Sequence, residues 1–375
     1  MNMELTNQKR GLRLRIPRIL PAAGKLRGWR AGLVLAFVPM AACGEHQVAH
    51  SESPGPSEEA VQFASREITL SGTLVLPARS ERHPAVVLLH GSGPQGRDLF
   101  MARWFRDQGV AALAYDKRGV GESGGNFRAV PFMDLSNDGL AAIEYLKTRT
   151  DIDAKRIGVW GLSQGGWLGP LAASRSTDVA FVIAVSGPGV SPGEQMIVYY
   201  ANELRAAGLT ESDVREASAL RRNIWNYLSS GAGYKEAKTE LQQARAKRWY
   251  KQVKGQQDDL FGTLLTPAEL SKPDHPGFRW YQQEMNYDPV PTLRAVRVPA
   301  LFLFGDRDQL IPVAESVAAV QRVQAEDGRH EFTVREFPND DHGMRLTTGE
   351  ASGEIDPEYL KTIKEWLGTH IRNTP

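Results

Sequence analysis

Cysteine is nearly absent: the sequence of 375 residues contains one, Cys43. A single thiol excludes disulfide bonds within the chain and metal sites that need several cysteines. The sequence also lacks the G-x-x-x-x-G-K-[ST], H-E-x-x-H and dinucleotide-binding motifs, so we expect no metal ion, nucleotide or organic cofactor. The apolar run at residues 31–42 has twelve residues, whereas a membrane-spanning helix needs about 20. We therefore expect no permanent transmembrane helix there.

A strong net charge is absent as well, because the sequence contains 45 Lys and Arg residues and 44 Asp and Glu residues. Residues 1–43 hold eight of the basic residues and one of the acidic ones, which leaves the rest of the chain with 37 against 43, a net charge of −6. An acidic body is a poor partner for nucleic acid, whose binding depends on neutralising phosphates. The hydrophobic share of 41% and the charged share of 24% are those of a soluble globular protein.

The N-terminal 43 residues are laid out like a secretory signal. A basic stretch up to Arg30 is followed by the apolar run and then by Ala41, Ala42, Cys43 and Gly44. The small residues before Cys43 resemble a bacterial lipobox, which implies that Cys43 is lipidated and becomes the new N-terminus, although Met40 stands where such motifs usually have leucine. We expect a lipid-anchored protein of the cell envelope, with residues 44–60 as a flexible tether. The alternative is a cytoplasmic protein with an apolar N-terminal helix.

From residue 61 onward, short apolar strands alternate with helical segments. Residues 61–70 and 72–76, separated by Ser71 and Gly72, predict a hairpin. The further apolar runs lie at residues 85–89, 110–115, 157–160, 179–185 and 300–304. Near-continuous apolar strands between helices predict an α/β fold with a mostly parallel, doubly wound sheet. Ligands of such sheets bind at the carboxyl ends of the strands.

The alternation stops between about residues 188 and 297, where strand-like runs are lacking. This stretch is rich in Glu, Lys, Arg, Gln and Ala, and Thr210 and Asp213 form a plausible capping box. The domain of residues 61–375 is therefore expected to carry a helical cap insertion. Its eight paired aromatic residues could cover a substrate or could pack against one another. The chain is longer than the roughly 250–300 residues that a single hydrophobic core usually holds, which agrees with such an insertion.

The pattern Gly-x-Ser-x-Gly occurs three times, and its context selects one serine as a nucleophile. A nucleophile elbow needs a strand that runs straight into the serine and a helix that leaves from it. Ser123 lies in a loop that reaches Pro131 without a helix, and Ser191 is followed by Pro192, which has no backbone N–H to offer an oxyanion. Ser163 follows the run at 157–160 directly and opens a small-residue helix. Because its motif, residues 161–165, follows that run without a gap, we predict Ser163 as the nucleophile.

A serine nucleophile needs a base and an acid that orients the base. Among eight histidines, His342 lies in a loop after the predicted strand 330–336 and before the last helix, and it completes the chain order Ser, acid, His. His90 ends a strand and is expected to be structural. The acid should leave the preceding strand, whose turn contains Asp306 and Asp308. We favour Asp308, since its place farther along the turn allows it to curl back, and keep Asp306 as the alternative.

Two backbone N–H groups should bind the oxyanion. One belongs to Gln164, the residue after the nucleophile. The other should come from the loop after Leu89, where glycines let the main chain approach a substrate. Ser92 is the predicted donor and Gly93 is the alternative.

With these motifs the sequence resembles the α/β-hydrolase superfamily, and within it bacterial serine esterases similar to dienelactone hydrolases and acyl-aminoacyl peptidases. The resemblance covers roughly residues 61–187 and 287–372. It rests on His90-Gly-Ser-Gly-Pro94, Tyr115-Asp-Lys-Arg-Gly-Val-Gly-Glu-Ser123, Gly161-Leu-Ser-Gln-Gly165, Gly305-Asp-Arg-Asp308 and Asp341-His-Gly343. Dienelactone hydrolases use cysteine where this chain has serine, which favours esterase or peptidase chemistry.

The resemblance implies a serine hydrolase that cleaves carboxylic esters through an acyl-enzyme. Its expected partners are a small-molecule ester or a short acyl or peptide substrate, and a membrane through the anchor at Cys43. An aminopeptidase or acyl-peptidase of related fold is the alternative among enzymes. A non-catalytic lipoprotein that binds a ligand in the cleft is the alternative outside them, since a fold does not establish an activity.

Overall fold

The computed structural model describes residues 56–78, 82–127, 130–187, 189–251 and 284–372. Its strands form one eight-stranded sheet in the order β1-β2-β4-β3-β5-β6-β7-β8. The first three strands in this order pair antiparallel and all later pairs are parallel, which confirms the predicted α/β class. The strands are β1 Ser57–Ser65, β2 Ile68–Leu76, β3 His83–Leu89, β4 Ala111–Tyr115, β5 Ile152–Leu162, β6 Val182–Val185, β7 Ala300–Gly305 and β8 Phe332–Phe337.

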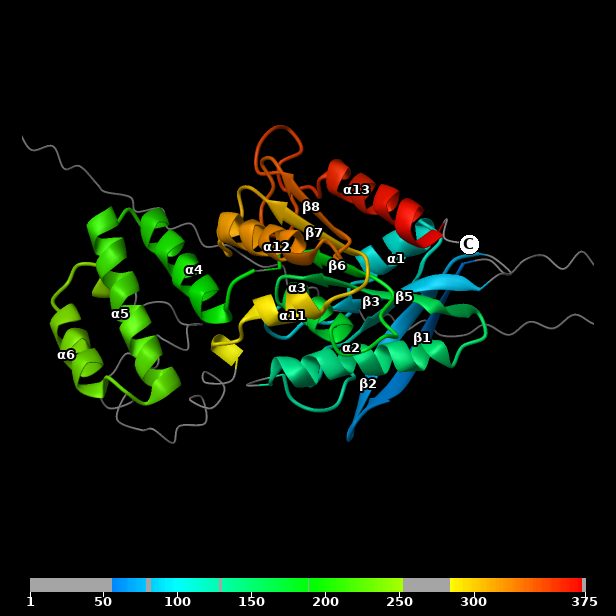
Figure 1. Ribbon diagram of the computed structural model, residues 1–375, viewed down its shortest axis with the longest axis horizontal. Helices are drawn as coiled ribbons and strands as arrows, with labels where there is room; N and C mark the ends of the chain where they lie inside the picture. The colour runs from blue at the N-terminus through cyan, green and yellow to red at the C-terminus, as the bar shows by residue number, and fades with distance from the viewer. Residues whose placement is uncertain (1–55, 79–81, 128–129, 188, 252–283, 373–375) are drawn as a thin grey trace, which may run out of the picture. The chain divides into compact units, whose positions relative to one another are not determined.

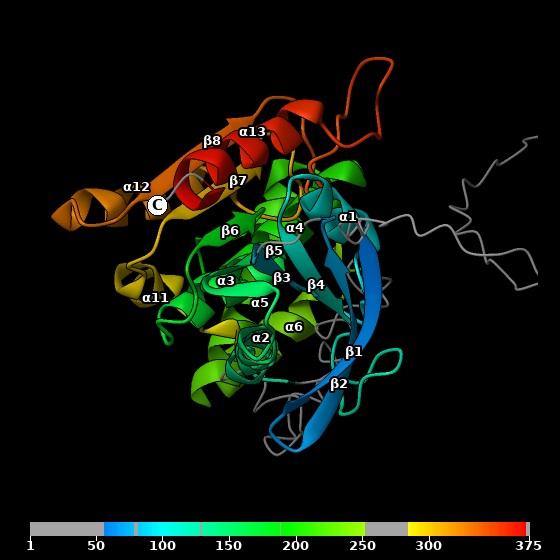
Figure 2. The ribbon, with the colours of Figure 1, turned by 90° about the vertical axis from the view of Figure 1, so that its right-hand side faces the viewer.

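Helices cover both faces of the sheet, as Figure 2 shows. One face packs against α1 (Leu99–Asp107) and α13 (Pro357–Leu367), which continues into a π-helical turn, η2 (Gly368–Arg372). The other face packs against α2 (Phe132–Lys147), α3 (Gln164–Ala173), α11 (Pro289–Ala295) and α12 (Val313–Asp327). Residues of β3 alternate between the two cores: Val87 and Leu89 belong to one, Val86 and Leu88 to the other. A strand buried on both faces therefore reads as a continuous apolar run.

The predicted hairpin exists, but its turn does not lie at Ser71 and Gly72. Strand β1 begins at Ser57, within the segment predicted as tether, and the turn is formed by Arg66 and Glu67. Ser71 and Gly72 lie inside β2. A Cβ on Gly72 would come within 2.8 Å of the Ala114 carbonyl oxygen of the neighbouring strand. The glycine serves the close approach of two strands there, and it does not form the turn.

Between β6 and α11 the described residues form three long helices: α4 (Pro192–Ala206), α5 (Glu211–Ser230) and α6 (Tyr234–Ala244). They lie together in Figure 1 and share an apolar cluster of their own. Five aromatic residues are buried in that cluster: Tyr200, Trp225, Tyr227, Trp249 and Tyr250. Thr210 and Asp213 form the predicted capping box. No helix in the described ranges has the length and apolar character needed to cross a membrane.

Candidate active site

Ser163 stands between β5 and α3 with no residue of a loop on either side. Its φ of 58° and ψ of −115° lie in a region that residues with a Cβ rarely occupy. A conformation of this kind costs about 1–3 kcal/mol and persists where the surrounding structure enforces it. This sharp strand-to-helix turn is the geometry that a nucleophile elbow requires.

The flanking glycines make this turn possible. A Cβ on Gly161 would collide with the backbone of Gly165, and one on Gly166 would collide with the backbone of Gly187. A Cβ on Gly165 would lie 2.7 Å from the Leu89 carbonyl oxygen. Helix α3 therefore packs against the ends of β3 and β6 more closely than any larger residue allows.

The serines of the other two Gly-x-Ser-x-Gly patterns have structural hydrogen bonds. Buried Ser123 donates to the Asp116 carbonyl at 2.6 Å and accepts from the Ser71 N–H at 2.9 Å. Ser191 is the N-cap of α4 and accepts from the Glu194 N–H at 3.3 Å. Each serine hydroxyl thus holds backbone in place, and neither lies at a strand-to-helix elbow.

The structure brings Asp308 and His342 together. Asp308 follows β7 and its Oδ2 lies 2.7 Å from Nδ1 of His342, in the loop after β8. The Asp308 side chain is fully buried, and its Oδ1 accepts the N–H groups of Leu310 at 2.7 Å and Ile311 at 3.2 Å. Because a carboxylate can only accept, His342 donates from Nδ1 and its Nε2 is left free to take a proton.

Asp306, the alternative acid, braces the turn. Its Oδ1 accepts the Asn339 N–H at 2.7 Å, and the Arg307 N–H next to it donates to the Asp340 carbonyl at 2.9 Å. A Cβ on Gly305 would collide with the Asp340 carbonyl. The turn that carries Asp308 is thereby packed backbone to backbone against the loop that carries His342.

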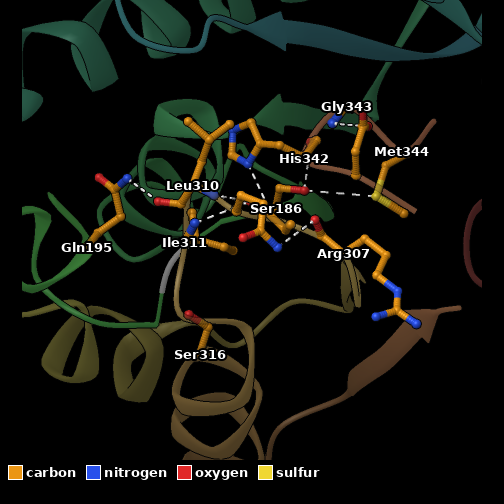
Figure 3. Close-up of polar contacts among 12 residues, drawn as sticks. Ser186, Gln195, Arg307, Leu310, Ile311, Ser316, His342, Gly343 and Met344 are labelled. Carbon is orange, nitrogen blue, oxygen red and sulfur yellow. Dashed lines mark hydrogen bonds and ion pairs between the residues drawn. The ribbon is translucent and has the colours of Figure 1, made fainter. Parts of the chain in front are cut away.

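Two consecutive residues at the end of β6 connect Ser163 with the histidine loop. The Val185 carbonyl accepts the Ser163 N–H at 2.8 Å. The Ser186 hydroxyl donates to the His342 carbonyl at 2.9 Å, as Figure 3 shows. Ser186 is fully buried and has a φ of 48°. Nothing in the local sequence around Ser186 marks this contact, because the loop of His342 lies far along the chain.

Helix α4 of the cap holds the turn that carries Asp308. Gln195 Nε2 donates to the Leu310 carbonyl at 2.5 Å, a contact visible in Figure 3. Asn202 Nδ2 donates to the Gln309 carbonyl at 2.9 Å. The cap is therefore bonded directly to the loop of the candidate acid.

The loop after β3 carries the predicted oxyanion donor Ser92. The Gly91 N–H is taken by Oε1 of Gln95 at 2.8 Å. Within the described residues, no acceptor takes the N–H of Ser92 or of Gln164. Gly93, the alternative donor, has a φ of 79° and open space around its Cβ position.

Lys117, at the end of β4, also reaches this loop. Its Nζ donates to the Gly91 carbonyl at 2.8 Å and to Gln164 Oε1 at 2.7 Å. Its place two residues past a buried strand of a parallel sheet puts it at the edge where ligands bind, but no sequence pattern marks its contacts with Gly91 and Gln164.

His90 has the structural place predicted for it. Its Nε2 lies 2.6 Å from the Tyr115 carbonyl oxygen, to which it must donate. Burial lowers the pKa of His90 to about 4, so the ring is neutral at pH 7. Cys43 lies outside the described residues. Within the described residues, no group of three His, Cys, Asp or Glu side chains could hold a metal ion.

Comparison with known sequences gives one family and several relatives. Residues 80–335 match the family described as serine aminopeptidase, S33. Esterase EstD of Thermotoga maritima is 24% identical over 324 residues, which is 81% of this chain and 68% of that protein. The quorum-quenching protein AidA of Acinetobacter baumannii is 26% identical over 260 residues, 67% of this chain and 79% of that protein.

Solved structures share the fold at lower identity. An esterase of Pyrococcus furiosus is 17% identical with a TM-score of 0.51, over 84% of this chain and 92% of that chain. The acylaminoacyl peptidase of Pyrococcus horikoshii is 16% identical with a TM-score of 0.53, over 86% of this chain and 43% of that chain.

Proposed function

Because the chain belongs to the serine aminopeptidase S33 family of α/β-hydrolases and is a hydrolase, we propose that it cleaves carboxylic esters through an acyl-enzyme on Ser163. The contact of Asp308 with His342 is the observation that supports this proposal most. Ser163 itself stands at a strand-to-helix elbow. A serine, a base and an acid in this chain order are the parts that acyl transfer needs.

In the proposed reaction, His342 Nε2 takes the hydroxyl proton as Ser163 Oγ bonds to the ester carbonyl carbon. The carbonyl oxygen becomes an oxyanion, to which the N–H groups of Ser92 and Gln164 donate. The carbon–oxygen bond to the alcohol then breaks, and the imidazolium returns the proton to the leaving oxygen. Water repeats the sequence on the acyl-enzyme and releases the carboxylic acid. Asp308 holds the imidazole in the required tautomer and stabilises its cation.

Aminopeptidase activity is the second candidate, and the description of the matched family favours it. The two activities share the acyl-enzyme and differ in the leaving group, an alcohol or an amine. Rates on nitrophenyl esters of increasing acyl length, measured beside aminoacyl nitroanilides, distinguish them. A preference for nitroanilides of free amino acids would replace the esterase proposal by the peptidase one.

A fluorophosphonate probe tests whether Ser163 is activated, because only an activated serine is phosphonylated. We expect labelling of the wild type at Ser163 and a loss of turnover of at least about 10⁴-fold in Ser163→Ala. Ser123→Ala and Ser191→Ala are the matched controls and should retain activity. Absence of labelling in the wild type would favour a binding protein without catalysis.

We also propose that Cys43 carries a lipid anchor that holds the hydrolase at a membrane of the cell envelope. The support comes from the sequence alone: a basic stretch, a short apolar run and small residues directly before the cysteine.

A further inference from the structure

Lys117 is buried in the loop after β4, at the same edge of the sheet as the elbow. The residue has an exposed fraction of 3%. A buried ammonium is costly unless its donors are satisfied. Nζ donates to the Gly91 carbonyl at 2.8 Å and to Gln164 Oε1 at 2.7 Å. Strand β4 lies next to β3, and β3 lies next to β5, so Lys117 connects the carboxyl ends of three strands.

Lys117 holds the loop of residues 91–95 at both ends. Its side chain bonds the Gly91 carbonyl, and its backbone N–H donates to the Gln95 carbonyl at 3.1 Å. The Gln95 side chain closes the loop by accepting the Gly91 N–H. Lys117 and the Gln95 side chain together therefore hold the conformation of this short segment.

The Gly91 carbonyl and the Ser92 N–H belong to the same peptide group. In a planar trans peptide these two bonds point in opposite directions. An ammonium on the Gly91 oxygen therefore fixes the direction of the Ser92 N–H and withdraws electrons from the peptide, which makes that N–H a stronger donor. The second bond holds the side chain of Gln164, whose backbone N–H is the other proposed oxyanion donor.

We propose that Lys117 is a positioning residue of the oxyanion hole, which it organises by binding the Gly91–Ser92 peptide and Gln164 at once. This inference rests on the proposed acyl-enzyme chemistry. The lysine stabilises the transition state through the two donors and through its charge, because negative charge develops on the substrate oxygen during the reaction.

The charge of Lys117 can be titrated near neutral pH. Burial lowers the pKa of Lys117 to about 8, although the negative charge of Asp138 opposes this effect. Around it, Arg118 is paired with Asp138 and Arg97 with Asp116, and His90 is neutral because burial lowers its pKa to about 4. Loss of a proton from the base His342 would raise the rate rather than lower it, because only a neutral imidazole can accept the serine proton. A fall in rate above pH 8 is therefore assigned to Lys117.

The test compares Lys117→Met and Lys117→Arg with the wild type on a nitrophenyl ester between pH 6 and 10. Lys117→Met should lower kcat about 10- to 100-fold, which is no more than the fall in kcat caused by removing one oxyanion donor. The KM should change less than about twofold. A trifluoromethyl ketone, which forms a tetrahedral adduct with the serine, should bind more weakly by the same factor as kcat falls. Lys155→Met, an exposed lysine of β5, is the matched control and should behave as the wild type.

The pH profile separates a charge effect from mere packing. The wild-type kcat should fall above pH about 8, and this fall should be absent in both variants, because methionine carries no charge and arginine keeps its charge. Lys117→Arg should be faster than Lys117→Met at pH 9. An unchanged kcat in Lys117→Met, or a trifluoromethyl ketone that binds Lys117→Met as tightly as it binds the wild type, would overturn the inference. Failure of the fluorophosphonate to label wild-type Ser163 would instead contradict the proposed function.

Discussion

The hydroxyl of Ser186 donates a hydrogen bond of 2.9 Å to the carbonyl of His342, although 156 positions separate the two residues. Val185, which precedes Ser186 in the chain, accepts the N–H of Ser163 through its carbonyl. Val185, the last residue of β6, and Ser186, which follows it, thus bond to the proposed nucleophile and to the residue of the proposed base. Two adjacent residues link the elbow of Ser163 to the loop that carries His342.

Removal of the Ser186 hydroxyl should therefore reduce catalysis more than folding. In Ser186→Ala the His342 carbonyl loses its donor, and small displacements of a catalytic group can cost up to about 10²-fold in rate. We expect kcat to fall about tenfold or more with KM little changed, measured on a nitrophenyl ester. The control is Ser316→Ala, a buried serine of α12 that also donates to a backbone carbonyl, that of Pro312 at 2.7 Å. An equal loss of kcat in both variants would show that the effect is one of stability alone.

The two carboxylates of the turn after β7 should differ sharply in their effect. Asp308→Asn should lower kcat by about 10⁴-fold, because an amide in place of Oδ2 favours the wrong tautomer of His342. Asp306→Asn should keep most of the activity, since an amide oxygen can still accept the Asn339 N–H. Steady-state kinetics on the purified variants decide this. Greater damage from Asp306→Asn would exchange the two assignments.

Stability should depend on pH through the buried Asp340. Burial, and then the charge of Asp356, raise the pKa of Asp340 to about 7, whereas an aspartate in an unfolded chain has a pKa near 3.9. A raised pKa means that the folded state holds the proton more tightly. This contribution to stability is therefore present below about pH 4 and is lost as the pH rises to about 7.

Asp340→Asn should remove this part of the pH dependence. The wild-type Tm should fall between pH 5 and pH 8. The fall in the Tm of the variant should be smaller than the wild-type fall by at least about 3 °C. Differential scanning calorimetry at both values measures the difference. Glu284, whose pKa burial raises to about 7, adds to the fall in both proteins, and His90, whose pKa burial lowers to about 4, opposes it in both. Asp107→Asn, which removes an exposed carboxylate, is the control. A variant with the full wild-type pH dependence would contradict the assignment to Asp340.

The sequence predicted the parts of the fold that local patterns encode. Continuous apolar runs gave the parallel strands, and the capping residues of α5 marked its start. Ser71 and Gly72 predicted a turn that does not exist there, because the same pair suits both a turn and a close contact between strands. Helix α11 was predicted within the cap insertion, yet its Leu293 is buried in the core of the sheet. A helical pattern shows that one face is apolar, but not which core that face enters.

The residues of the candidate site also fall into those that the sequence predicts and those that it does not. Ser163, Asp308 and His342 follow strands and could be selected by their place in the chain order; their catalytic roles stay predictions. The roles proposed for Ser186 and Lys117 rest on contacts with backbone carbonyls of other segments. A carbonyl is present at every position, so no sequence pattern marks such a contact. Only the three-dimensional arrangement reveals these two residues.

The last prediction concerns Cys43, which lies outside the described residues. A lipid at this residue should place the full-length protein in the detergent phase, and mass spectrometry of its N-terminal peptide should find an acylated Cys43. Each buried CH₂ group contributes about 0.8 kcal/mol, and a single acyl chain binds membranes only marginally, so several chains are needed for a lasting anchor. Cys43→Ser should release the protein or block its processing.

Catalysis should not depend on that anchor. A chain that begins at Gly44 retains every described strand, since β1 begins at Ser57. We expect it to hydrolyse small nitrophenyl esters at the rate of the full-length protein, measured in detergent for both. An exported protein whose N-terminal peptide still begins at Met1 and carries no lipid would contradict the anchor. Because the proposed active site lies wholly between β3 and α13, that result would leave the proposed hydrolysis untouched.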